Sequence, residues 1–207
     1  GESTVQTTSK AEQAVQLTVD GLLLGLILAL AAVGLSLIFG TTGLTNFAHG
    51  EMVTVGALAA YFYSAVLSIP FILSALLALI TCAVLGALQD KLLWKQLRRR
   101  GTGLIAMLVV SIGLAIFVRY LFLFFFGGGT QQFPEYSAQA GLQFGPLSIT
   151  PKAIIGAIAA IMAILATIYW LLRTRMGKAR RAVSDNPALA SASGIDVERV
   201  INTVWIL

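Results

Sequence analysis

The sequence predicts an all-α protein, a polytopic bundle of transmembrane helices. Of its 207 residues, 57% are hydrophobic and 11% are charged, with a mean hydropathy of +0.87, whereas soluble domains carry about 25% charged residues. The apolar residues form runs long enough to cross a bilayer. The basic residues fall in short clusters between these runs, so the net charge of +5 indicates membrane topology rather than nucleic-acid binding.

We expect about five spans and the start of a sixth, organised as one transmembrane domain over residues 17–207. A polar tail over residues 1–16 precedes it, with room for a short lead-in helix. The chain lacks an initiator Met and ends inside an apolar run, so we expect it to be part of a longer protein, cut at both ends. The expected spans cover about residues 17–39, 43–67, 71–93, 102–126 and 151–172, and residues 200–207 begin the sixth.

The second span is expected to be a broken or short helix that either crosses fully or re-enters, because polar side chains and glycines interrupt its first third. It holds Asn46, His49 and Glu51, and an ionisable group at mid-membrane costs roughly 2.5–3.5 kcal/mol unless it faces a bundle interior, a wet cavity or a partner subunit. Asn46 and His49 share one face of a regular helix, while Glu51 points elsewhere. These groups either serve a function there or only hydrogen-bond between helices and lock the bundle.

The chain carries no familiar catalytic or metal motif. One His and one Glu leave a divalent ion short of ligands, and Cys82 stands alone in an apolar span, which excludes a disulfide framework. Neither a G-x-x-x-x-G-K-[ST] phosphate loop nor a G-x-S-x-G or H-E-x-x-H motif occurs. We therefore expect no cofactor and no metal, and an enzyme is the weakest hypothesis.

Two basic clusters set the orientation of the spans. They are separated by two crossings, so both lie on one side, which the positive-inside rule makes the cytoplasm. The N-terminus is then outside if the second span crosses fully, and inside if that span re-enters. The clusters are Lys91, Lys95, Arg98, Arg99 and Arg100, and Arg173, Arg175, Lys178, Arg180 and Arg181.

Two features on the other side leave alternatives open. Arg119 lies inside the span over residues 102–126, where it is expected to reach the far interface with its head group or to pair with a carboxylate such as Glu51. The loop over residues 127–150 has short apolar patches. It is expected to fold either as a hairpin or as a short helix on the membrane surface.

The cytoplasmic loop over residues 173–199 predicts a short helix from about Pro187 to Ser193. Asn186 is among the polar N-cap candidates, Pro187 suits the first helical position, and Gly194 suits a helix C-terminus. The side chains of this helix are small, so it gains little by burying its own face. It is either docked in a partner's groove or a solvated connector held at the membrane surface by its arginines.

The stretch GLSLIFGTTGLTNFAHGEMVTVGALAAYF closely resembles the permeases of branched-chain amino acid ABC importers. Thr45 stands where those permeases tend to carry isoleucine. The span that contains Arg119 and the loop over residues 173–199 are similar as well, so the resemblance covers nearly the whole chain after residue 17. The matching positions are Asn46, Phe47, Ala48, His49, Gly50, Glu51, Gly56, Ala57, Arg119, Gly127, Gly177, Arg181, Ala182, Asn186, Ala190 and Gly194.

The resemblance implies a multi-pass permease subunit of the bacterial cell membrane that imports leucine, isoleucine and valine. Its expected partners are two cytoplasmic ATPase subunits, a related second permease and an extracytoplasmic substrate-binding protein. Such permeases are longer, so the chain would correspond to their N-terminal two thirds. The translocation path or gate is assigned to Asn46, His49, Glu51 and Arg119, and the coupling to the ATPases to Asn186, Pro187, Ala188, Leu189, Ala190 and Gly194.

Other functions remain open at this point. Relatives of the same family move urea, short amides or other amino acids, and the binding protein usually sets the selectivity. A stand-alone channel or secondary transporter would use His49 and Glu51 for protons or ions, and it predicts inverted repeats. We see no clear repeat in the sequence. A purely structural scaffold would leave the polar trio unexplained.

Overall fold

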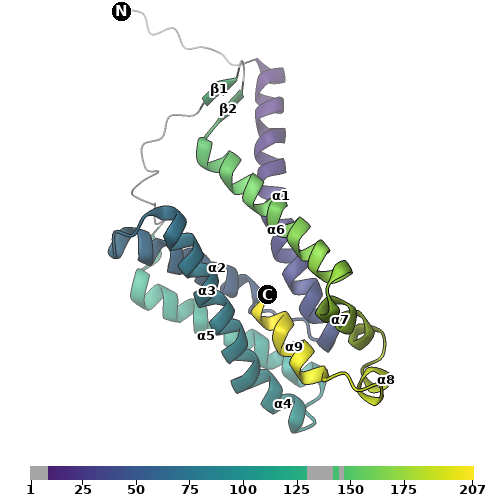
Figure 1. The fold of residues 1–207 in the computed structure, drawn as a ribbon. Coiled ribbons are helices and arrows are strands. Elements are labelled where there is room, and N and C mark those ends of the chain that lie inside the picture. Colours follow the sequence, from purple (N-terminus) through teal and green to yellow (C-terminus); the bar gives the residue numbers. More distant parts are fainter. Residues whose placement is uncertain (1–8, 130–141, 145–146) are drawn as a thin grey trace, which may run out of the picture.

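The computed structural model describes residues 9–129, 142–144 and 147–207, which are almost entirely helical (Figure 1). The elements are α1 (Lys10–Thr42), α2 (His49–Tyr61), the π-helical turn η1 (Phe62–Val66), α3 (Phe71–Gln89), a second π-helical turn η2 (Asp90–Trp94), α4 (Lys95–Arg99), α5 (Leu104–Phe126), β1 (Leu142–Phe144), β2 (Leu147–Ile149), α6 (Pro151–Arg173), α7 (Arg175–Asp185), α8 (Pro187–Ala192) and α9 (Val197–Ile206).

Four helices in the described part of the chain are long and apolar enough to cross a membrane, which confirms the all-α bundle but not the span count. They are Lys10–Thr42, Phe71–Arg99, Leu104–Phe126 and Pro151–Arg173. The second expected span is shorter than these, because only α2 and η1 are helical in it. Helix α9 begins at Val197, where the Asp196 side chain accepts a hydrogen bond from the Arg199 amide.

Two of the helices run past their predicted ends. Helix α1 begins at Lys10, because Ser9 and Glu12 form a reciprocal capping box. The expected lead-in helix is therefore continuous with the first span. Helix α3 continues through η2 into α4, and an i→i+5 bond from the Lys95 amide to the Asp90 carbonyl keeps it helical through the basic cluster.

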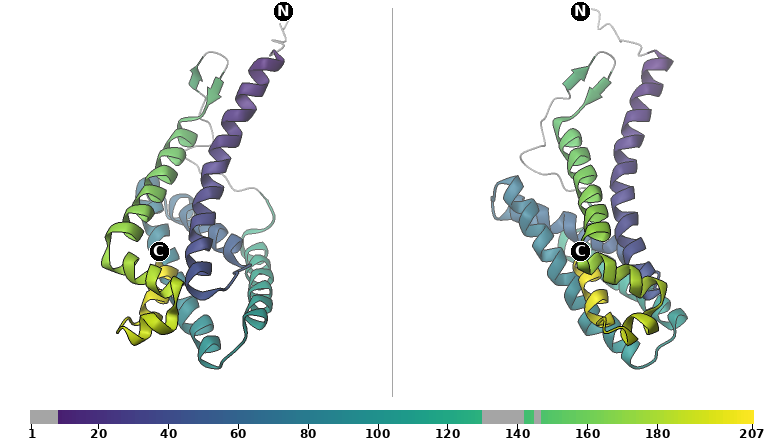
Figure 2. Two further views of the ribbon diagram at one scale, coloured as in Figure 1. Left: turned by 90° about the vertical axis from the view of Figure 1, so that its right-hand side faces the viewer. Right: turned by 45° about the vertical axis from the view of Figure 1, so that its right-hand side comes forward.

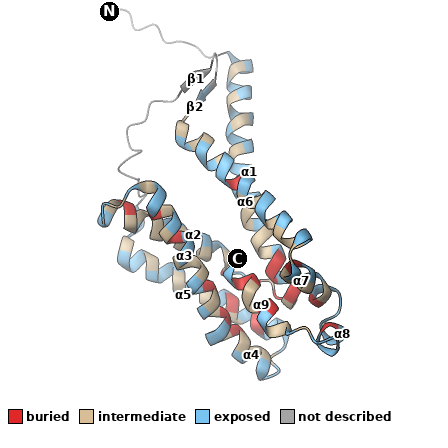
Figure 3. Cartoon of the chain, in the orientation of Figure 1, coloured by how far each residue is buried: buried red, intermediate tan, exposed pale blue. Residues whose placement is uncertain are grey.

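The helices form two arms that meet at the end carrying both basic clusters (Figures 1 and 2). Helices α1 and α6 pack along each other in one arm, and α2, α3 and α5 form the other. Buried residues gather where the arms meet, around α7, α9 and the joint between α3 and α4 (Figure 3). The main cluster joins Leu37, Met107, Trp94, Ile201 and Trp205, from elements far apart in the sequence.

The N-terminal end of α1 lies beside the hairpin of β1 and β2, at the end opposite the basic clusters (Figure 1). The strands pair antiparallel with Gln143 opposite Ser148, which confirms the hairpin alternative, while residues 130–141 of this loop lie outside the described part. Gln16 donates to the Ser148 carbonyl at 3.0 Å and accepts from its amide at 2.9 Å. The start of α1 and the hairpin therefore lie at the same end of the bundle.

Candidate functional site

The chain breaks between α1 and α2, and the polar stretch of the second span lies at this break. Gly43 ends α1 with a positive φ of 68°, and α2 begins only at His49. Asn46 therefore lies before the helix, so the argument that Asn46 and His49 share a helix face is wrong. The buried Asn46 instead accepts from the Ala48 amide through Oδ1 at 3.1 Å, and its backbone carbonyl accepts from the His49 amide.

His49 ties the start of α2 to the middle of α1. Its Nε2 lies 2.8 Å from the Ala31 carbonyl oxygen, and because a carbonyl only accepts, Nε2 carries the hydrogen. In the neutral imidazole this leaves Nδ1 with a free lone pair. A Cβ added at Gly34 would lie 3.3 Å from His49 Cε1, so the small residue lets the ring approach α1.

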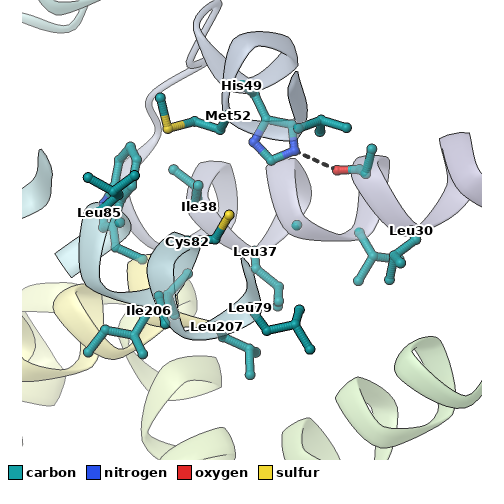
Figure 4. Close-up of a pocket in the computed structure, with 18 of the residues that line it drawn as sticks. Leu30, Leu37, Ile38, His49, Met52, Leu79, Cys82, Leu85, Ile206 and Leu207 are labelled. Carbon is teal, nitrogen blue, oxygen red and sulfur yellow. Dashed lines mark hydrogen bonds between the residues drawn. The ribbon is translucent and has the colours of Figure 1, made fainter. Parts of the chain in front are cut away.

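His49 also borders a cavity of about 410 Å³ between α1, α2, α3, α6 and α9 (Figure 4). Its wall is mostly aliphatic, with Leu37, Met52, Leu79 and Cys82 among the side chains that face it. No Asp, Glu, Lys or Arg of the described residues lines it. Such a wall suits an aliphatic group, whereas a charged group entering it needs a polar partner; His49, Gln89 and Thr167 are the lining side chains able to provide one.

Of the four residues assigned to the path, only His49 lines the cavity, and Asn46, Glu51 and Arg119 lie apart from it. Glu51 is half-buried in the first turn of α2, and Arg119 is exposed on α5. Within the described residues, neither side chain forms an ion pair. The pairing of Arg119 with Glu51, one of two alternatives from the sequence, is therefore not observed.

The short helix in the cytoplasmic loop forms as predicted, as α8. The Asn186 side chain accepts from the Leu189 amide at 3.0 Å, Pro187 is the first helical residue, and Gly194 takes a φ of +87°. Ala190 is buried against α7 and α9, while Leu189 is 64% exposed. Leu189 is thus an apolar side chain at the basic end of the bundle that a partner surface could cover.

Two further charged residues, which in the sequence indicate only the membrane topology, make specific contacts in the structure. Asp90, fully buried, binds Arg98 and Asn202. Arg180 turns inward and donates through Nη2 to the Ser36 and Leu37 carbonyls of α1, at 3.3 Å each. Burial lowers the pKa of the Arg180 guanidinium, and the nearby Asp185 opposes that effect.

No metal site emerges from the residues that the structure describes. None of them form a group of at least three His, Cys, Asp or Glu side chains placed to hold an ion.

The comparison with known proteins agrees with the resemblance seen in the sequence. The family model described as branched-chain amino acid transport system / permease component matches residues 17–207. The chain is 27% identical over 201 residues to the high-affinity branched-chain amino acid transport system permease protein LivH of Salmonella typhimurium, covering 91% of this chain and 64% of that protein. It thus spans a little under two thirds of that relative's length.

Two other relatives extend this range. The chain is 24% identical over 205 residues to the high-affinity branched-chain amino acid transport system permease protein BraD of Pseudomonas aeruginosa, covering 93% of this chain and 66% of BraD. It is 29% identical over 188 residues to the probable branched-chain amino acid transport permease protein LivH of Methanocaldococcus jannaschii, covering 87% and 58%. No solved structure matches the chain.

Proposed function

The chain belongs to the family of branched-chain amino acid transport permeases, and from this premise we propose that it is the membrane-spanning permease subunit of an ATP-driven importer of leucine, isoleucine and valine. It is a multi-pass protein of the plasma membrane. The observation that carries the proposal is α8, a capped helix with an exposed Leu189 at the basic end of the bundle. A short rigid helix in a groove gives the differential contact that coupling to ATP hydrolysis requires.

The partners follow from this role. Two cytoplasmic ATPase subunits would receive α8 in their grooves, and Leu189 would be the side chain that they cover. A related second permease would complete the membrane unit, and an extracytoplasmic binding protein would deliver substrate at the hairpin side. The chain itself would perform no covalent chemistry.

The cavity beside His49 is the part of the translocation path that we assign to the substrate. Its aliphatic wall would hold the branched side chain, because burial of apolar surface is favourable. The free Nδ1 lone pair of His49 is able to accept a hydrogen bond from the substrate's ammonium group. Asn46 would hold the break that lets His49 face the cavity, Glu51 would gate the path, and Arg119 would balance charge.

Co-purification tests the importer. The full-length parent gene is expressed with its chromosomal neighbours and purified through a tag on this subunit in mild detergent, and uptake is then measured in liposomes. We expect the ATPases and a second permease to co-elute, and Leu189→Asp or Gly194→Pro to release the ATPases. Ser191→Asp, also on exposed α8 surface, is the matched control. A protein that elutes alone and conducts solute without ATP contradicts the proposal and favours a channel.

Cys82 tests the path, because it is the sole cysteine in the sequence and lies in the cavity wall. A small maleimide is added to the assembled transporter, and labelling of the Cys82 peptide is followed by mass spectrometry, with Cys82→Ser as the blank. Leucine is expected to slow the labelling and glutamate is not. Labelling that ignores leucine removes the cavity from the path, and protection by urea alone moves the substrate assignment to small amides.

A further inference from the structure

Helices α7, α8 and α9 form one packed body. Val183 of α7, Ala190 of α8 and Val200 of α9 are all buried in a common cluster. The Ile195 amide donates to the Ala190 carbonyl across the turn that joins α8 to α9. Because these residues pack without intervening solvent, a push on α8 displaces α9 with it.

A group of four side chains fastens α9 to the cytoplasmic end of α3. Asp90 accepts from Arg98 Nη1 and Nη2 at 3.0 and 2.9 Å, and from Asn202 Nδ2 at 3.0 Å. Arg98 also donates to Glu198, from Nε at 3.3 Å and from Nη2 at 3.0 Å. We name Asp90, Arg98, Glu198 and Asn202 the polar clamp. Asp90 lies in η2 and Arg98 in α4, while Glu198 and Asn202 lie on successive turns of α9. The clamp therefore joins the cytoplasmic end of α3–α4 to α9.

Burial makes the clamp hard to open. The Asp90 carboxylate has 0% exposure and the Arg98 side chain only 16%, so separating them would leave a buried charge without a partner. The π-helical turn η2 begins at Asp90, and such turns are frequent at functional positions of helices. Above the clamp, Trp94 stacks on Trp205 with ring centroids 5.9 Å apart.

The α3 end of this connection leads to the cavity. Helix α3 lines the cavity with Leu79 and Cys82, and a Cβ added at Gly56 of α2 would meet Cys82 Sγ at 3.3 Å. Helices α2 and α3 are thus in close contact about two turns beyond His49. Movement of α3 therefore reaches the helix that carries His49.

The polar contact of the same body with α1 is weaker, although Leu37 also packs with Ile201 and Trp205 in the core cluster. Arg180 reaches the Ser36 and Leu37 carbonyls at 3.3 Å, and its buried Nε has no hydrogen-bond partner. These acceptors are neutral, whereas the clamp joins opposite charges, and all but one of the Arg98 bonds in it are 2.9–3.0 Å long. When α7–α9 is displaced, the contact with α1 is the one expected to yield.

From this difference between the two attachments, we infer that the polar clamp transmits the motion of α8 and α9 to the membrane-spanning helices. Asp90, Arg98, Glu198 and Asn202 act as positioning residues that make α3 follow α8 and α9, so that the cavity between α3 and α1 changes shape when the ATPases move. This inference rests on the proposed function. It adds a route from α8 to the cavity, and it assigns that route to residues outside both groups predicted from the sequence.

The test measures leucine uptake and ATP hydrolysis together, with the full-length permease assembled with its ATPases in liposomes. Arg98→Gln removes the central donor, and Glu198→Gln, whose side chain is 36% exposed, weakens the clamp with less risk to folding. Arg99→Gln is the matched control, because Arg99 is exposed and forms no ion pair within the described residues. Arg98→Lys preserves the charge.

We expect both clamp variants to hydrolyse ATP while the leucine imported per ATP falls about fivefold, since coupling-network substitutions shift coupling by amounts of this order. Arg99→Gln should leave this ratio unchanged, and Arg98→Lys should restore part of it. If uptake and hydrolysis fall in proportion in Glu198→Gln, the clamp does not transmit motion and the inference is overturned. If the unaltered permease binds no ATPase, the proposed function is overturned instead. This binding is therefore measured before any variant is tested.

Discussion

The membrane-spanning part of the chain and its cytoplasmic end are held together by different means. In the most apolar stretch of each span, at most 17% of the residues are buried, and few polar bonds cross between the helices. At the cytoplasmic end, α9 alone buries Val200, Ile201, Val204 and Trp205, and it carries two members of the polar clamp. The contrast is visible in the colours of Figure 3.

This difference follows from the solvent that each part meets. In lipid, exposing apolar side chains on the outer face of a helix carries no free-energy penalty. Helices there associate through small residues and occasional polar contacts, such as that of His49 with the Ala31 carbonyl. At the water side, burial of apolar surface drives packing. Within the described residues, the cytoplasmic end is therefore the more densely packed part.

The largest effect is expected from Asp90→Asn, which leaves Arg98 facing a neutral group at the buried position, with the more exposed Glu198 as its remaining carboxylate. Loss of one partner from a buried ion pair costs about 3 kcal/mol or more. Thermal unfolding of the detergent-solubilised protein, followed by size-exclusion chromatography, measures the loss. The exposed Asp185→Asn at the same end is the control. Equal stability of Asp90→Asn and the unaltered protein would show that the clamp adds nothing.

A smaller loss is expected from Gly86→Ala, because a Cβ at this position would collide with the Trp205 carbonyl of α9. A backbone neighbour cannot rotate away, so α9 must shift, at a cost of about 1–3 kcal/mol. Gly113→Ala in α5 meets nothing within 4 Å and serves as the control in the same unfolding assay. A Gly86→Ala protein as stable as the control would contradict the close packing of α9 on α3.

Asn186→Ala should remove the cap of α8 at a cost of about 1 kcal/mol, and only locally. Hydrogen exchange of residues 187–194 should speed up while that of α9 stays unchanged, and the ATPases should bind more weakly. Ser191→Ala lies on the exposed surface of the same helix and should change neither. Unchanged exchange in Asn186→Ala would mean that packing of Ala190 alone holds the helix.

The smallest effect on stability is expected in the spans, from Glu51→Ala. Glu51 has no ion-pair partner within the described residues, so its removal should change the free energy of unfolding by less than about 0.5 kcal/mol. Leucine uptake should nevertheless fall severalfold if Glu51 gates the path, whereas Thr54→Ala, one turn further along α2, should not affect it. Intact uptake in Glu51→Ala would remove the gating role.

The parts of the fold that the sequence predicts well are those set by local chemistry. Runs of apolar residues give the span positions, and Asn186, Pro187 and Gly194 give α8 nearly to the residue, because caps act within one turn. The lead-in helix before residue 17 was left open by the sequence, and the capping box of Ser9 and Glu12 makes it the first turns of α1. The face shared by Asn46 and His49 was wrong, because the helix begins at His49 itself.

The clamp and the cavity depend on contacts between segments that are distant in the sequence. The periodicity of apolar residues indicates local structure and does not predict such contacts. Arg98 and Glu198 are 100 residues apart in the chain, and in the sequence Arg98 is one of several arginines that report topology. Its buried partner Asp90 looks like an ordinary residue at a membrane interface. Similarly, His49 is recognised as unusual by its position in an apolar span, but only the fold shows that its ring is tied to Ala31.

The paired hydrogen bonds between Gln16 and Ser148 have a consequence for the outer face of the protein. A primary amide that donates to a backbone carbonyl and accepts from the same residue's N–H imitates the neighbouring strand of a sheet. A hairpin of two strands is only marginally stable in water. Here a single side chain of α1 makes hydrogen bonds of the kind that a third strand would make. The amide thereby occupies one place on an edge that would otherwise be open to strands from other chains.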